Sequence, residues 1–389
     1  MYMAVSSACT IIPPPAARQR QLPTAPLSVL APYSNLQFAY FVNPNQRRRR
    51  RLLHLNRFNT SSAPVSTLGT TDEHDSPQTS TAVGEGSGGG SGWPEFAEKV
   101  SGEWDGFGAD FTVDGKPVHL PESVVPEAFR EWEVEVFDWQ TQCPTLAQPH
   151  HINAGDEPPS FFYKTIKLLP TVGCEADAAT THSISEKHIS SASTFAYHRP
   201  TGSYVALWSP LSGNSPAAEL EHCLIDPGDR ESRVRVVQAF GLGQDGSIEL
   251  RGLSLFVEQW YGPFRNGDQL GGCAIRDSAF AATRPLDSSR VSGLVWEGLT
   301  SVADFRALHN KTMIKELGEE CVNETIRDES DLILLPKQLW CSVKKAESGT
   351  TCCEVGWLLD QGRAITSKCT FLNAQLKEIA LAVETATVK

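Results

Sequence analysis

Short runs of alternating apolar and polar residues recur along this chain, and they constrain its fold more than any other feature. In Arg233-Val-Arg-Val-Val237 the valines alternate with arginines, the period-2 pattern of a half-buried strand. The segment Ser247–Arg251 continues the pattern, and after Gly252 it resumes out of phase at Leu253, which predicts a β-bulge at the glycine. Turn dipeptides such as Asp114-Gly115 separate the runs. The chain is therefore predicted to be mainly β, as a barrel or sandwich of short strands.

Further segments extend this prediction. In Trp132–Trp139 the residues Trp132, Val134 and Val136 alternate with glutamates, so a strand is expected there. Five more strands are predicted near the C-terminus, over Ser330–Leu335, Gln338–Lys344, Cys352–Leu359, Ile365–Leu372 and Leu376–Glu384. Helical patterns are confined to Pro94–Ser101 and to Val302–Glu320, where one or two helices are expected.

The N-terminal region differs in composition from the rest. No Asp or Glu precedes Asp72, whereas the same stretch holds eight arginines, five of them consecutive at Arg47–Arg51, and no lysine. Many Ser, Thr, Ala and Pro residues surround them, which is the composition of an organelle transit peptide. A nuclear signal is the rival interpretation of the arginine run. We expect residues 1–71 to be a chloroplast transit peptide and the protein to reside in the stroma, or at the thylakoid surface.

The remaining chain divides into a linker and two β-rich regions. Residues 72–92 include the segment Gly84–Gly92, which is Gly- and Ser-rich and is expected to be a disordered linker. We predict a first β-barrel over 93–285 and a smaller, second β-rich domain over 286–389, with the helical segment near its start. An internal duplication is one interpretation, because Trp104 and Trp296 each stand two residues before a glycine where a region opens.

Composition and motif searches exclude several function classes. From Asp72 onward, 26 basic residues face 46 acidic ones, and this negative charge argues against nucleic acid as a partner. No apolar run approaches the ~20 residues of a transmembrane helix. The ten cysteines lack metal-ligand spacing, and the catalytic templates for hydrolases, nucleotide-binding loops and zinc proteases are absent. No catalytic residue, metal ligand or cofactor is therefore assigned.

The most specific local motif is Gly102-Glu103-Trp104. A Gly-x-Trp on the first strand of a small antiparallel barrel lets the indole close one end of the barrel. An arginine from a later strand often covers such a ring by a cation–π contact.

Several segments resemble a known family. Gly102–Gly106, Leu220–Asp226 with Arg233–Gln238, and Leu255–Gly262 are similar to the lipocalin-like DUF3598 family of cyanobacteria and plastids. In the C-terminal region, Leu334–Pro336 and Glu354–Leu359 followed by Arg363 resemble the second half of that family. The resemblance covers roughly residues 95–385. It implies a calycin-type architecture, a lipocalin-like antiparallel β-barrel followed by a smaller barrel-like unit. It implies no catalytic residues, and its distant kin include barrels that attach bilin pigments.

Aromatic and basic residues are the candidates for a ligand site, because the cavities of such barrels are mostly apolar with a few polar anchors. Arg233 and Arg235 share a face of one predicted strand, which is either solvated or turned inward to clamp a carboxylate. The candidate ligand-binding residues are Trp104, Trp132, Trp139, Arg233, Arg235 and Trp260.

The leading functional hypothesis is sequestration of a small apolar or amphipathic molecule, such as a lipid, a carotenoid or a tetrapyrrole. One alternative is an assembly or stability factor with a photosynthetic complex as its partner. The other is a pigment lyase-like enzyme, although an enzyme is less favoured because the sequence offers no catalytic constellation.

Overall fold

The structure is a computed structural model, and it describes most of the chain from Gly92 onward. The described residues are 92–148, 159–172, 180–190, 192–209, 217–244, 246–268, 279–306, 313–346, 348–360 and 362–387. They all belong to the compact unit Gly84–Lys389. The predicted transit peptide, 1–71, and the linker up to residue 91 lie outside them.

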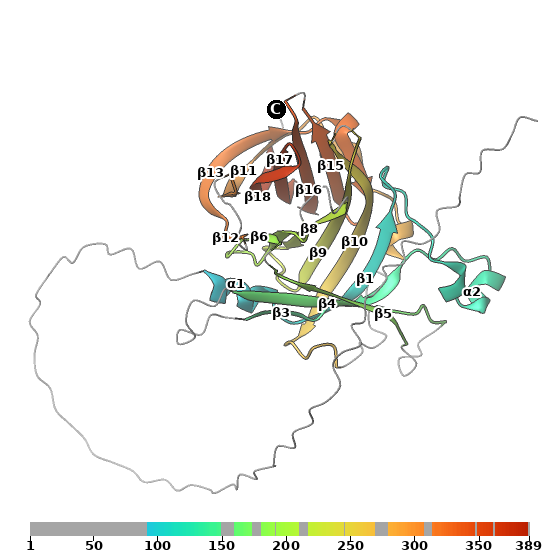
Figure 1. Ribbon diagram of the computed structural model, residues 1–389. Coiled ribbons are helices and arrows are strands. Elements are labelled where there is room, and N and C mark those ends of the chain that lie inside the picture. The colour runs from blue at the N-terminus through green and yellow to red at the C-terminus, as the bar shows by residue number, and fades with distance from the viewer. Residues whose placement is uncertain are drawn as a thin grey trace, which may run out of the picture. The chain divides into compact units, whose positions relative to one another are not determined.

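Two sheets contain nearly all of the regular structure, which confirms the mainly β prediction (Figure 1). The first sheet has eleven strands, and its long strands β8, β9, β10 and β1 run side by side. Its strands are β1 (Glu103–Phe111), β2 (Trp139–Gln142), β3 (Thr145–Gln148), β4 (Ser160–Leu168), β5 (Thr181–His188), β6 (Thr194–Tyr197), β7 (Tyr204–Leu207), β8 (Ala217–Ile225), β9 (Ser232–Leu242), β10 (Ile248–Gly262) and β12 (Met313–Glu316).

The second sheet is smaller, with seven strands in the order β13-β11-β18-β17-β16-β15-β14. The strands are β11 (Val295–Asp304), β13 (Gly318–Ile326), β14 (Leu332–Leu335), β15 (Leu339–Lys345), β16 (Thr350–Asp360), β17 (Arg363–Leu372) and β18 (Gln375–Thr387). The five strands predicted over 330–384 are all present. In each sheet the first strand pairs with a later, longer one, β1 with β10 and β11 with β18.

Helices are short and few among the described residues. The α-helices are α1 (Trp93–Val100) and α2 (Glu127–Glu131), and the 3-10 turns are η1 (Glu122–Val124), η3 (Phe280–Ala282), η4 (Ser288–Arg290) and η5 (Glu329–Asp331). Helix α1 is the helix that the sequence predicts over 94–101. It buries Trp93, Phe96 and Val100 against the first sheet.

The bulge predicted in β10 is also present. The pairing of β10 with β9 shifts register between Leu250 and Gly252, so residue 251 has no partner in the ladder. The shift moves Leu253 and Leu255 onto the face that packs against the second sheet.

The strand predicted over 132–139 is wrong except at its last residue. Trp132 is the C-cap of α2, and Glu133 has a φ of 54°, which an extended strand does not allow. Trp132 and Val134 are 61% and 46% exposed, so no sheet covers the alternating pattern. Strand β2 begins only at Trp139.

The helix predicted over 302–320 is also wrong. The described parts of this segment are strands: β11 continues to Asp304, β12 follows at Met313, and β13 begins at Gly318. Ala303 and Phe305 are buried in the core, and β11 pairs on both sides, with β13 and β18. Tertiary pairing has overridden the local preference for a helix. Strand β12 joins the first sheet, parallel to β6, although it follows the opening strand of the second sheet.

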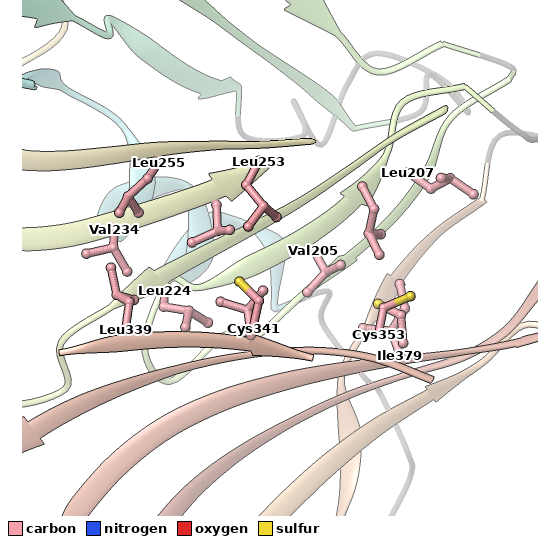
Figure 2. Close-up of a cluster of buried hydrophobic side chains, with 14 of the residues drawn as sticks. Val205, Leu207, Leu224, Val234, Leu253, Leu255, Leu339, Cys341, Cys353 and Ile379 are labelled. Atoms are coloured by element: carbon pink, nitrogen blue, oxygen red, sulfur yellow. The ribbon is translucent and has the colours of Figure 1, made fainter. Parts of the chain in front are cut away.

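One hydrophobic core lies between the two sheets, so the β-rich regions share it. Figure 2 shows Val234, Leu224 and Leu255 of the first sheet facing Leu339 and Cys341 of the second. We call the sides that meet here the inter-sheet faces. The opposite side of the first sheet, against α1, is the α1 face, and the opposite side of the second sheet is the Trp296 face. In the described residues, no helix is long and apolar enough to cross a membrane.

His222 of β8 is a polar residue within this core. Its Nε2 donates to Gln238 Oε1 at 3.3 Å, and its Nδ1 accepts from the Ser367 hydroxyl of the second sheet at 2.7 Å. Burial lowers the pKa of His222 from 6.5 to about 3. The folded protein therefore holds this imidazole neutral under mildly acidic conditions.

This depressed pKa predicts acid sensitivity. Between pH 7.5 and pH 5 the unfolded chain protonates His222 and the folded chain does not, so the residue removes up to about 2 kcal/mol from the free energy of unfolding. Urea unfolding of the wild type and of His222→Gln at both pH values tests this. His198, whose pKa is lowered to about 4 by burial, titrates in both proteins and cancels in the comparison. Equal losses in the two proteins would contradict the prediction.

Candidate functional site

Trp104 of β1 is fully buried at the end of the first sheet where α1 packs. Its indole Nε1 donates to the carbonyl of Val100, the last residue of α1, at 3.0 Å. The guanidinium of Arg233 lies 4.2 Å from the ring centroid. This confirms the predicted cation–π contact between the first-strand tryptophan and an arginine from a later strand.

Arg233 and Arg235 both turn inward, to the α1 face, and are 1% exposed. The carboxylate that they clamp belongs to the protein itself. Glu258 of β10 accepts from Arg233 Nε at 2.6 Å and from Arg235 Nη2 at 2.7 Å. Burial opposes the ionisation of Glu258, but the two arginines outweigh burial and hold its pKa below the usual value.

A second buried carboxylate completes this network. Glu221 of β8 accepts from Arg235 Nη1 at 3.3 Å and from the Tyr204 hydroxyl at 2.8 Å. The Tyr163 hydroxyl and Trp208 Nε1 also donate to Glu221, at 2.5 and 2.6 Å. Two arginines face two glutamates, so the network has no net charge, and each of the four charged groups has hydrogen-bond partners within the protein.

The other three predicted site residues lie apart from this network. Trp132 is exposed beside α2. Trp139 is buried and stacks on His182, with ring centroids 4.7 Å apart and Lys167 Nζ 5.4 Å from its ring. Trp260 is 36% exposed and lines a surface groove of about 430 Å³ next to α1, whose other lining residues are all charged. The structure thus joins only Trp104, Arg233 and Arg235.

The second sheet repeats the first arrangement. Trp296 of β11 is fully buried, and its Nε1 donates to the carbonyl of Val291 at 3.0 Å. The guanidinium of Arg327 lies 5.7 Å from the Trp296 ring and 5.2 Å from the Trp340 ring. A buried tryptophan near the start of the first strand therefore meets an arginine in both sheets.

The strand register relates the two arrangements position by position. Gly106, two residues after Trp104, pairs with Glu258, and Gly298, two residues after Trp296, pairs with Glu384. Both glycines lie so close to the neighbouring strand that a Cβ atom would overlap a backbone carbonyl oxygen. The duplication considered from sequence therefore extends to the packing of these strands.

The correspondence continues across the next strands. The register leads from Glu258 across β9 to Ile225 of β8, and from Glu384 across β17 to Leu358 of β16. Glu221 and Glu354 each lie four residues before these positions, so the two glutamates correspond. The same alignment superposes Tyr204 on Trp340. Each of these aromatic residues donates to its glutamate, and Trp340 Nε1 lies 3.0 Å from Glu354 Oε1.

The two arrangements differ in the origin of the cation. The position of Arg233 is occupied by Ala364 in the second sheet, and the guanidinium is instead supplied by Arg327, directly after β13. Arg327 Nε donates to Glu354 Oε1 at 2.6 Å and Nη2 to Glu384 Oε2 at 2.8 Å. Its Nη1 is buried and has no hydrogen-bond partner.

A hollow of about 210 Å³ opens on this arginine. We call it the Arg327 hollow. It is lined by Thr325, Ile326, Arg327, Asp328, Asp331, Leu332, Ser342, Lys344, Cys352, Glu354 and Lys368. The lining combines apolar walls with charged groups of both signs, which is the composition of a site for a small polar or amphipathic molecule.

Sequence reasoning did not find this site. The repeated Trp-x-Gly was the only signal for it, because it marked the second sheet as a copy of the first. The register places Arg327 at the position that Thr145 takes after β2 in the first arrangement, so the repeat did not indicate an arginine there. Within the described residues, no group of three or more His, Cys, Asp or Glu side chains is placed to hold a metal ion.

Comparisons with known proteins find similarity among solved structures. No family model matches the chain, and no curated protein matches it. Among solved structures, it is similar to a protein of unknown function from the DUF3598 family of Nostoc punctiforme, at 14% sequence identity and a TM-score of 0.45. The likeness covers 77% of this chain and 100% of that protein.

Proposed function

We propose that the protein binds a small amphipathic molecule, and that the Arg327 hollow is the binding site. The observation that supports this is the Nη1 group of Arg327, a buried donor without an acceptor on a residue that lines the hollow. A buried donor without a partner costs about 1–3 kcal/mol, which a ligand oxygen would recover. Ile326 and Leu332 supply apolar wall for the rest of the ligand.

The α1 face of the first sheet is less suited to a ligand. Phe161, Phe195 and Tyr204 contact one another there, with ring centroids 5.0–5.1 Å apart. The saturated network of Arg233, Arg235 and their glutamates occupies the neighbouring volume. In this proposal the first sheet has a structural role, and the ligand binds to the second sheet.

The proposal retains two expectations from the sequence. The protein is a lipocalin-like member of the DUF3598 family, and its acid-free, arginine-rich leader directs it to the chloroplast. The ligand would then be a plastid metabolite or lipid.

Native mass spectrometry of the protein purified from plastids, with an absorption spectrum, tests the proposal. We expect a bound small molecule, whose mass identifies its class. Its position is tested by alkylation: Cys352 lines the hollow and should react several-fold more slowly in the loaded protein than after the ligand is stripped. Cys321, an exposed thiol outside the hollow, serves as the internal control. Equal Cys352 rates with and without ligand would refute this site.

An assembly factor is the second candidate function. It is favoured by exposed apolar side chains on neighbouring strands of the second sheet, Leu299 of β11 and Val322 and Ile326 of β13, at 52%, 62% and 66%. Such a patch is typical of a protein contact surface. An empty hollow together with a stoichiometric protein partner in the same mass spectrum would place this function first.

A further inference from the structure

Arg327 restricts the chemistry of the ligand, if the Arg327 hollow is the binding site as proposed. The side chain is more than nine-tenths buried, and its position is fixed by Glu354, Glu384 and two indole rings. A guanidinium has only donors, so the buried, unpartnered Nη1 can be satisfied only by an acceptor atom of the ligand. Carboxylates and phosphates are the acceptors that guanidinium groups bind most strongly.

Lys368 supplies a second positive charge. It stands on β17 directly opposite Glu354 and lines the same hollow. Among the ion pairs of the described residues, Lys344 is matched to Asp331 at 2.5 Å, whereas Lys368 has no such pair. A ligand anion next to Arg327 would therefore meet a lysine whose charge is not already compensated.

The buried carboxylates limit how much negative charge can enter. Glu354 and Glu384 already oppose the charge of Arg327, and Asp328 and Asp331 also line the hollow. A dianion such as a phosphate monoester would be repelled by these four groups. A monoanion brings half the charge of a dianion next to these carboxylates, and it still supplies the acceptor that Nη1 lacks.

The size of the hollow sets the third limit. Its volume of about 210 Å³ is below the ~300–1,000 Å³ of sites that enclose drug-sized molecules. It suits a small acid, or the charged end of a longer amphiphile whose tail leaves along Ile326 and Leu332.

We infer that the ligand is a monocarboxylate whose carboxylate group accepts from Arg327 Nη1 and lies beside Lys368. The second sheet thus resembles the first-sheet network, except that the ligand supplies the acceptor for Arg327 Nη1.

Calorimetric titration of the full-length protein, first stripped of any bound molecule, tests this inference. The probes are octanoate, 1-octanol and octyl phosphate, which share a tail and differ in the head group. Octanoate should bind at least several-fold more tightly than the other two. In Lys368→Met the affinity for octanoate should fall about tenfold, because one of its two cations is lost. Lys377→Met on the adjacent strand β18, which does not line the hollow, is the matched control and should bind as the wild type does.

The outcomes separate this inference from the proposed function. If 1-octanol binds as well as octanoate, with Cys352 protected and Lys368→Met without effect, the site stands and the monocarboxylate is refuted. If octyl phosphate binds best, the charge argument is wrong. If none of the probes binds or protects Cys352, and the plastid protein carries no small molecule, both the inference and the proposed function fail.

Discussion

Glu258→Gln should destabilise this protein more than almost any other single substitution. The change preserves the shape of the side chain but removes the charge that compensates Arg233 and Arg235, all three of which are essentially excluded from water. Glu221 would remain as the only anion for two buried guanidinium groups. Breaking a buried ion pair by removing one partner costs about 3–5 kcal/mol, because an uncompensated charge stays behind.

Equilibrium unfolding in urea, followed by tryptophan fluorescence and by circular dichroism, measures this loss. The matched control is Glu249→Gln on the same strand, β10, because Glu249 pairs with Arg251 at the surface and both side chains are well exposed. The control should unfold at nearly the wild-type urea concentration. A Glu258→Gln protein within about 1 kcal/mol of the wild type would show that the network is not held by charge compensation.

Alanine at Gly106 or at Gly298 should also be strongly destabilising. A Cβ atom at Gly106 would lie 1.9 Å from the Val257 carbonyl oxygen, and one at Gly298 would lie 2.3 Å from the Val383 oxygen. These oxygens belong to paired central strands, so they cannot withdraw without breaking the ladder. Overpacking of this kind costs about 1–3 kcal/mol or more in a well-packed core.

Gly318→Ala is the control for both substitutions. Gly318 is also in a strand of the second sheet, but a Cβ atom there would meet nothing within 4 Å. Its stability should be unchanged or slightly higher, because alanine restricts the unfolded chain more than glycine does. If Gly106→Ala destabilises and Gly298→Ala does not, the two sheets do not share the packing arrangement that the register indicates.

The strands were predictable where the alternation was long and one side was covered. The run around Arg233 and Arg235 became β9, and the phase change at Gly252 became a register shift in β10. The same rule failed at Trp132, where a pattern of equal quality follows α2 and stays exposed. Alternation indicates a strand only if a neighbouring strand is there to pair with it, and the sequence does not show the neighbour.

The candidate site was only partly predictable for a related reason. A contact between Trp104 and an arginine of a later strand was expected from the Gly-x-Trp motif, and the structure identifies that arginine as Arg233. Arg327 was not expected, since its partners Glu354 and Glu384 lie 27 and 57 residues away along the chain. No local pattern brings such residues together.

By itself, the sequence determined the mainly β class, the positions of β9, β10 and the last five strands, and the fact that Arg233 and Arg235 share a face. Only the tertiary structure decided that this face turns inward onto Glu258, that one core joins both sheets, and that the second arrangement leaves Arg327 with a buried donor that has no acceptor. The reason is physical: periodicity records which residues point the same way, whereas burial, charge compensation and a binding hollow depend on which distant strand covers them.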